Sequence, residues 1–160
     1  MKVNSFMRST QTLMCTDITY AYLTSKYGNT ILLDTENSDH DFIVSTFQKV
    51  SKYQPISTLS KDYKYSIDVR VFIGDIYSDS ELCNRSIIAI NKYFKDKMYQ
   101  NLFCCVDINV GLNPDSYSII QDSILKYMEW NNLDPDIINF ERLKKAYYRY
   151  RKAKNDTHAQ

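Results

Sequence analysis

The sequence predicts an α+β protein in which helices pack on a mixed β-sheet of about four strands and two further helices close the chain. Three observations lead to this fold class. Residues 63–77 alternate apolar and polar side chains, as a half-buried strand does. Residues 83–94 carry apolar side chains at helical spacing. Near the C-terminus, two prolines directly follow residues that commonly cap helices, which is typical of a helix start.

The N-terminal half of the chain contains the first helix and most of the expected strands. Residues 8–22 predict a helix that leads into a short strand. Residues 29–47 predict a strand or loop, then an acidic turn, then a strand at about 41–47. In residues 63–77 the apolar positions are Ile67, Val69 and Val71, so this segment is expected to be a strand of the sheet.

A long helix is expected to follow. Ser78 and Glu81 have the spacing of a capping box, in which each side chain bonds to the other residue's backbone amide. The apolar stripe of this helix consists of Cys83, Ile87, Ile90 and Phe94.

Three elements complete the prediction. Residues 101–112 are apolar on both faces of an extended chain, which predicts a central strand. Two helices then begin, one at Asn113 with Pro114 and the other at Asp134 with Pro135. The predicted order is helix, two or three strands, helix, strand, helix, helix.

Length and composition favour one globular domain. The chain has 160 residues, of which 44% are apolar, so we expect a single domain over residues 1–155 and a disordered tail at 156–160. No apolar run approaches a membrane span, and the N-terminus lacks the apolar stretch of a secretory signal. We therefore expect a cytoplasmic protein with no membrane partner. Abundant Asn, Lys, Ile and Tyr are typical of A/T-rich genomes, including viral ones, for which the location is the host cytoplasm.

The four cysteines predict no metal site. Their spacings do not match those of zinc-binding motifs, and the neighbours Cys104 and Cys105 are expected on opposite faces of a strand. We interpret all four, which include Cys15 and Cys83, as small buried apolar residues in a reducing compartment.

An acidic stretch, "TENSDHDFIV" at residues 35–44, is the strongest candidate site. If this segment is extended, Asp39 and Asp41 share one face and His40 points away. Two carboxylates so close repel each other, and a divalent cation removes the conflict. Asp68 in the strand at 63–77 is a candidate third carboxylate. Three carboxylates would hold two Mg²⁺ ions, the arrangement used for phosphoryl and nucleotidyl transfer.

These motifs resemble the polymerase-β-like nucleotidyltransferase superfamily, especially its minimal and phage-encoded members. Ser38, Asp39 and Asp41 stand where the family has Ser-Asp-x-Asp, and Asp68 stands where it has a later strand carboxylate. "YLTSKYG" at residues 22–28 is similar to the family's Gly-Ser turn. The resemblance covers residues 17–72, which is less than half of the chain.

The resemblance implies transfer of a nucleoside monophosphate from a nucleoside triphosphate to an acceptor, either RNA or a protein. The three aspartates would then be catalytic metal ligands for Mg²⁺, while Thr24 or Ser25, with Ser38, would contact the nucleotide phosphates. Leu23 stands where the family has a glycine that lets the backbone approach those phosphates. The resemblance therefore implies either an enzyme or a protein that keeps the fold without efficient catalysis.

Two further residues have alternative interpretations. His40 is expected to be a partly exposed side chain between two acids rather than a metal or catalytic histidine. Asp107 lies within the apolar segment 101–112, where a charged residue is unusual. It is either an alternative third carboxylate or a residue near a strand end that accepts bonds from backbone amides.

The charge is concentrated at the C-terminal end. Residues 142–154 contain seven basic and no acidic residues, while the rest of the chain has 13 basic and 19 acidic residues. At helical spacing, one face of this segment is expected to pack on the core and consists of Phe140, Leu143, Tyr147 and Tyr150. The other face is expected to point outward and consists of Arg142, Lys145, Arg149 and Lys152.

The outward face has two interpretations. It contacts nucleic-acid phosphates, with tyrosines stacking on bases, or it is a solvated helix end whose cations favour the C-terminal dipole. The sequence thus supports two functions. One is a Mg²⁺-dependent nucleotidyltransferase. The other is a non-catalytic protein, of a virus or phage, that binds a protein or nucleic-acid partner through its aromatic surface and basic helix.

Overall fold

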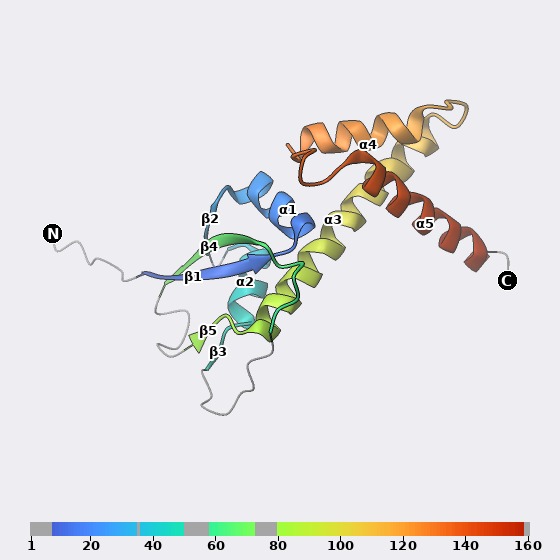
Figure 1. Ribbon diagram of the computed structural model, residues 1–160. Helices are drawn as coiled ribbons and strands as arrows, with labels where there is room; N and C mark the ends of the chain where they lie inside the picture. The colour runs from blue at the N-terminus through green and yellow to red at the C-terminus, as the bar shows by residue number, and fades with distance from the viewer. Residues whose placement is uncertain (1–7, 35, 50–57, 73–79, 159–160) are drawn as a thin grey trace. The chain divides into compact units, whose positions relative to one another are not determined.

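The computed structural model has an α+β architecture, as the sequence predicts, and describes residues 8–34, 36–49, 58–72 and 80–158 (Figure 1). The chain forms two compact units, residues 1–93 and 94–160. The first unit contains the sheets, and the second consists of helices.

A three-stranded mixed sheet forms the centre of the first unit. Its strands are β1 (Arg8–Cys15), β4 (Tyr65–Phe72) and β2 (Thr30–Leu32), in the order β1-β4-β2. β4 pairs antiparallel with β1 and parallel with β2, so that Asp68 lies in register with Thr12 and Thr30.

The alternation in β4 orients the sheet. Ile67, Val69 and Val71 are buried, whereas Asp68 and Arg70 are exposed. One face of the sheet therefore meets the core and the other meets water. This confirms the predicted strand over Tyr65–Phe72, while residues 63–64 precede the strand and residues 73–77 of the prediction lie outside the described residues.

Two helices connect the strands. α1 (Asp17–Tyr27) follows β1 directly and ends at Gly28, whose φ of 74° is in the left-handed region that favours glycine. α2 (Ser38–Ser45) follows β2. A second sheet consists of two antiparallel strands. β3 (Gln48–Lys49) follows α2 in the chain, and β5 (Ser80–Glu81) follows β4.

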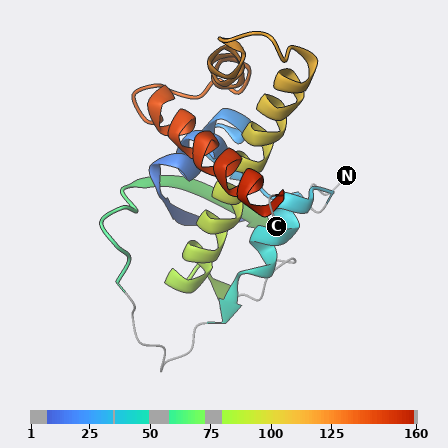
Figure 2. The ribbon, with the colours of Figure 1, turned by 90° about the vertical axis from the view of Figure 1, so that its right-hand side faces the viewer.

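Buried Asn91 joins the start of α3 (Asn84–Leu112) to the end of β1. Its side-chain oxygen accepts from the backbone N–H of Thr16 at 2.8 Å, and its amide nitrogen donates to the carbonyls of Met14 at 2.9 Å and Ile87 at 2.8 Å. All polar atoms of this side chain are therefore satisfied, which burial requires. α2 lies beside the same part of α3 (Figure 2), where Phe42 stacks on Tyr93 with ring centroids 4.1 Å apart.

Three predicted elements of this fold are wrong. Residues 8–22 form a strand followed by a helix, the reverse of the predicted order. The strand predicted at 41–47 is α2, because Asn37 accepts a hydrogen bond from the Asp39 N–H at 2.9 Å and so caps a helix. The strand predicted at 101–112 belongs to α3. Its buried positions recur every four residues at Phe94, Met98, Leu102 and Val106, which is a helical period.

The capping box predicted for α3 is not formed as expected. The helix begins at Asn84, and Glu81 belongs to β5. Ser78 lies outside the described residues. The predicted stripe itself is confirmed at Ile87, Ile90 and Phe94, which are all buried.

The second unit contains the rest of α3 together with α4 (Ile119–Trp130) and α5 (Phe140–His158). Both final helices exist as predicted, but each begins five residues or more after its predicted start at Asn113 or Asp134. Pro114 and Pro135 lie in the turns that precede the helices. α5 continues to His158, into the segment for which the sequence predicts disorder.

The core of the second unit is formed by side chains from all three helices and from the turn before α5. Its fully buried members include Met98, Leu102, Ile124, Leu143 and Tyr147. Within the described part of the chain, no helix combines the length and the apolar composition needed to cross a membrane.

Candidate functional site

Asp39 and Asp41 do not share a face. Because α2 is a helix, two residues that are two apart differ by about 200° around its axis. Asp39 is 1% exposed, whereas Asp41 points to solvent. The prediction that both carboxylates share one face is therefore wrong, and the reason is the helical conformation of residues 38–45.

Asp39 is enclosed by one cation and two phenols. Its Oδ2 accepts from Lys26 Nζ at 2.8 Å and from Tyr27 Oη at 3.1 Å, and its Oδ1 accepts from Tyr93 Oη at 2.9 Å. Burial alone would lower the pKa of Lys26, but the hydrogen bonds and charges of Asp39 and Tyr27 outweigh it and raise that pKa. The carboxylate is thus neutralised from within the protein.

Asp68 is on the exposed side of β4. Across the described residues, which include Asp39, Asp41 and Asp68, no three His, Cys, Asp or Glu side chains are grouped as ligands of one metal ion. The sequence places a third carboxylate in a strand correctly, but the fold does not bring the three together.

The residues expected to contact phosphate belong to helices. Leu23 is fully buried in α1. The hydroxyls of Thr24 and Ser25 donate to the carbonyls of Tyr20 at 2.7 Å and Tyr22 at 2.9 Å. Both are therefore engaged in their own helix rather than in a turn. Ser38, the first residue of α2, is exposed.

His40 is 6% exposed, so the prediction of a partly exposed side chain is wrong. Its Nδ1 accepts from the backbone N–H of Asp34 at 2.9 Å, and its ring lies 5.1 Å from that of Tyr27. Its Nε2 is buried without a hydrogen-bond partner among the described residues. The histidine therefore fixes the loop between β2 and α2.

Asp107 lies on the second half of α3. Its Oδ1 accepts from Tyr147 Oη at 2.8 Å, and its Oδ2 accepts from Tyr150 Oη at 2.9 Å and Lys154 Nζ at 2.8 Å. Burial would raise the pKa of Asp107, but these bonds outweigh it and lower that pKa. Both sequence interpretations are therefore corrected: the residue is on a helix, and it binds side chains of α5.

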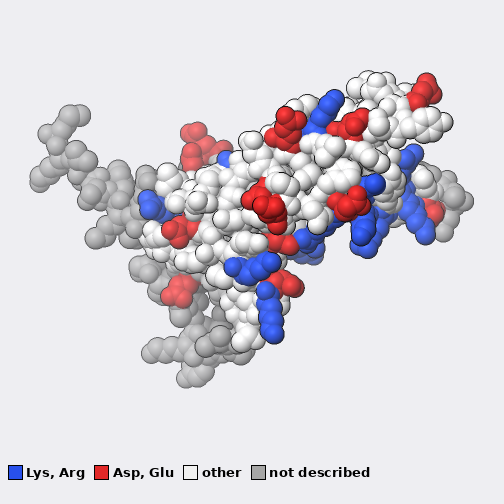
Figure 3. All heavy atoms as spheres, turned by 45° about the horizontal axis from the view of Figure 1, so that its top comes forward, with Lys and Arg blue, Asp and Glu red and all other residues white. Residues whose placement is uncertain are grey.

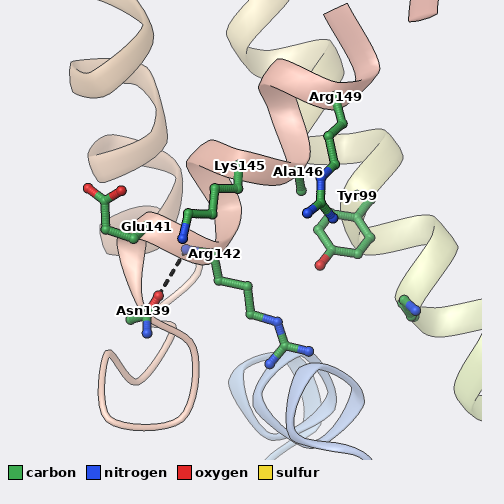
Figure 4. Close-up of a pocket in the computed structure, with 8 residues that line it drawn as sticks. Tyr99, Asn139, Glu141, Arg142, Lys145, Ala146 and Arg149 are labelled. Atoms are coloured by element: carbon green, nitrogen blue, oxygen red, sulfur yellow. Dashed lines mark hydrogen bonds between the residues drawn. The ribbon is translucent and has the colours of Figure 1, made fainter. Parts of the chain in front are cut away.

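Lys and Arg side chains gather along the C-terminal helix in the space-filling view (Figure 3). A groove with a volume of about 460 Å³ lies between α3 and α5 (Figure 4). Its lining includes four basic side chains, one carboxylate and one aromatic ring. These residues are Lys95, Tyr99, Asn139, Glu141, Arg142, Lys145, Ala146 and Arg149. Three of the four outward-facing residues predicted from the sequence line this groove. Lys152 is exposed, as predicted, but is not among them.

Much of the positive charge in the groove lining is not neutralised by carboxylates of the described residues. Lys95, Lys145 and Arg149 are exposed and make no ion pair with any described residue. Glu141 is 3.8 Å from Lys144, which is outside the lining. This region of the second unit, which we call the basic groove, can attract anions.

A row of aromatic rings adjoins the basic groove. Tyr99 stacks on Phe103 with centroids 5.7 Å apart, and Phe103 stacks on Tyr150 with centroids 4.5 Å apart. Sequence reasoning missed Lys95 and Tyr99 as groove residues. Their spacing of four places them on one face of a helix, but no feature of the sequence indicates that α5 packs beside that face.

The four thiols differ widely in environment. Cys15 is fully buried, and burial raises its pKa to about 12. Cys83 and Cys105 are partly exposed, and Cys104 is exposed on α3. The prediction of four buried apolar thiols is therefore confirmed only for Cys15. The expected opposite faces of Cys104 and Cys105 on a strand do not exist, because both residues are on a helix.

Comparisons with protein families, with curated proteins and with solved structures give no significant match to this chain.

Proposed function

We propose that the protein binds nucleic acid through the basic groove of its second unit and acts as a non-catalytic interaction protein. The observation that carries this proposal is that exposed basic side chains from two helices, without carboxylate partners in the described residues, line one groove. Lys95 comes from α3, and Lys145 and Arg149 come from α5. Phosphate contacts of this kind provide the sequence-independent part of nucleic-acid affinity.

The position of the charges argues against a merely solvated helix end. Cations favour the C-terminal end of a helix dipole and are disfavoured near the N-terminal end. Lys145 occupies the second turn of α5, which begins at Phe140. The dipole therefore explains the position of Lys154 in the last turns but not the position of Lys145. An anionic ligand would explain it.

The character of the groove favours a polymer over a small metabolite. Small-molecule pockets are mostly apolar and enclose their ligand. Here the lining has five charged side chains and one aromatic ring, and most of these residues are exposed. A strand whose phosphates pass from one basic side chain to the next would satisfy this arrangement.

The test is fluorescence anisotropy with labelled RNA and DNA over a range of salt concentrations. The double variant Lys145→Gln with Arg149→Gln should weaken binding and flatten the salt dependence by about 0.7 in the log–log slope for each lost phosphate contact. The matched control is Arg151→Gln with Lys152→Gln, which removes the same charge from exposed positions of α5 outside the groove.

The two variants together decide the proposal. A larger loss in the groove variant than in the control supports it. Equal losses would mean that only net charge matters, which would reject the groove as the binding site, and no binding by the wild-type protein at low salt would reject the function. Circular dichroism of both variants should match that of the wild type, because all four residues are exposed.

The nucleotidyltransferase-like fold and the Mg²⁺-dependent transfer reaction stay predictions that rest on the Ser38-Asp39-His40-Asp41 motif. The bonds of Asp39 to Lys26, Tyr27 and Tyr93 weigh against them. Calorimetric titration with each nucleoside triphosphate and Mg²⁺ tests them. Binding that disappears in Asp41→Asn and Asp68→Asn would restore the enzyme hypothesis, and the absence of binding would remove it.

A further inference from the structure

Tyr99 is the one aromatic side chain in the lining of the basic groove. It lies one helical turn after Lys95 on α3, and its ring is half-buried. Arg149 extends from α5 beside this ring, and Ala146 lines the groove near it (Figure 4). A flat ring, a guanidinium group and a small side chain therefore line the same groove.

The Tyr99 ring is held in place from behind. It stacks on Phe103 at an interplanar angle of 20°, and Phe103 in turn stacks on Tyr150 at 12°. Tyr150 is anchored by its hydrogen bond of 2.9 Å to Asp107. The row of rings joins the two helices, so Tyr99 presents a pre-positioned surface and loses little freedom when a ligand binds.

Resting on the proposed function, we propose that the groove takes a single strand and that one unpaired base stacks on Tyr99, while the neighbouring phosphates contact Lys145 and Arg149. Every base has an aromatic face, so such stacking tolerates different sequences. Arg149 lines the same groove as Tyr99, so its guanidinium is assigned to the phosphate of the same nucleotide.

The position of Tyr99 excludes a duplex from this contact. In a double helix the bases are stacked on each other and only their edges reach the grooves. A half-buried ring in the lining of a groove can meet the face of a base only when that base is unpaired. A duplex would touch the basic side chains alone and would gain nothing from the ring.

The first experiment compares ring removal with ring retention. Tyr99→Leu should weaken binding of oligouridylate by about tenfold or more, because a base–aromatic stack is lost. Tyr99→Phe keeps the ring and should bind within about twofold of the wild type. Tyr148→Leu is the control, since Tyr148 is an exposed tyrosine of α5 outside the groove. Binding of a blunt duplex should change equally little in all three variants.

The second experiment detects the stack directly and does not depend on Tyr99→Leu folding well. Trp130 is the single tryptophan of the chain and is 69% exposed, so Trp130→Phe gives a background without tryptophan. Tyr99→Trp in that background places a fluorescent reporter in the groove. Oligouridylate and oligothymidylate should quench its fluorescence on binding, whereas inorganic polyphosphate should bind without quenching it. Equal quenching by the two oligomers means that the site accepts RNA and single-stranded DNA alike, and quenching by one of them assigns the site to that strand.

The outcomes separate the two proposals. If the wild-type protein binds single strands and duplex equally and Tyr99→Leu changes neither, the stacking proposal fails while phosphate binding stands. If oligomers bind the Tyr99→Trp variant without quenching its fluorescence, the stacking proposal also fails. If no nucleic acid binds and the groove variant of Lys145 and Arg149 behaves like the wild type, the proposed function itself fails.

Discussion

Asp39 in the first unit and Asp107 in the second are held by the same set of groups, one lysine and two tyrosines. They differ in burial. The side chain of Asp39 is 1% exposed, and that of Asp107 is 29% exposed. Water can therefore replace part of the stabilisation that Lys154 and the two tyrosines give to the negative charge of Asp107. It cannot do so for Asp39 unless the first unit opens.

From this comparison we expect burial, rather than the identity of the partners, to decide how much each ion pair contributes to stability. A buried carboxylate that loses its partners carries the full desolvation penalty, while a partly exposed one is screened by water. The comparison also separates structure from function, because a carboxylate with three internal donors has few lone pairs left for a metal ion.

The largest effect is expected for Asp39→Asn. The amide that replaces the carboxylate has no charge to balance that of Lys26. Its NH2 group would also face another hydrogen-bond donor, either the Lys26 ammonium or a tyrosine hydroxyl. Lys26 is 40% exposed and can turn to water, so we expect a loss of about 3 kcal/mol in the free energy of unfolding rather than more. Urea denaturation measures it.

Asp41→Asn is the control for Asp39→Asn. It removes the same charge from an exposed position of α2 and should change stability by less than about 0.5 kcal/mol. A gain of stability in Asp39→Asn would show that repulsion between Asp39 and Asp41 dominates, as the sequence alone suggests, and would contradict the structure.

A smaller loss is expected for Asp107→Asn, about 1 kcal/mol, because the tyrosine bonds weaken at a partly exposed site. The variant should also loosen the packing of α5 against α3. Hydrogen exchange of α5 amides should therefore accelerate, while amides of β4 should keep their rates. Uniform acceleration in both units would contradict a local role for Asp107.

Removing single phenol groups sharpens the comparison. Tyr93→Phe and Tyr150→Phe each delete one hydroxyl bound to a carboxylate and keep the ring that stacks on Phe42 or Phe103. We expect a loss of about 1.5 kcal/mol for Tyr93→Phe and about 0.5 kcal/mol for Tyr150→Phe. Thermal or urea unfolding of both variants tests the order, and the reverse order would mean that burial is not the deciding factor.

The smallest effect concerns pH. The pKa of Asp107 is lower in the folded protein than its ordinary value of 3.8, so its contribution to stability is present above that value and is lost as pH falls through the lowered pKa. The difference in unfolding free energy between wild type and Asp107→Asn should be constant from neutral pH to about pH 5 and should shrink below about pH 4. A difference that grows on acidification would contradict the lowered pKa.

The parts of the fold that the sequence predicts correctly are those with one strong local period. The strand at Ile67, Val69 and Val71 and the helical stripe at Ile87, Ile90 and Phe94 each repeat at one spacing and point to one core. Residues 101–112 resemble a strand in the sequence because an apolar run with little polar interruption fits both elements. Only its continuation of the stripe from Phe94 through Met98 and Leu102 distinguishes the helix.

The features of the candidate site likewise fall into those that a local sequence pattern predicts and those that it does not. The exposure of Arg142, Lys145 and Arg149 follows from the spacing within one helix, so the sequence predicts it. The orientations of Asp39 and Asp41 depend on the local conformation, and Asn37 as a helix cap decides it. The positions of Lys95 and Tyr99 opposite α5 depend on how two distant helices pack, which no local pattern encodes.

The unequal burial of the cysteines has a practical consequence. A thiol reacts as the thiolate, so an alkylating reagent should modify exposed Cys104 in the native protein and should spare Cys15, which is sealed at the end of β1 with a pKa raised to about 12. Once Cys104 and the partly exposed Cys83 and Cys105 are blocked, slow labelling of Cys15 measures the opening of the first unit. Mass spectrometry identifies the peptide that carries labelled Cys15. The rate at which this peptide appears then reports how long the first unit stays closed, without denaturant and without any knowledge of the ligand.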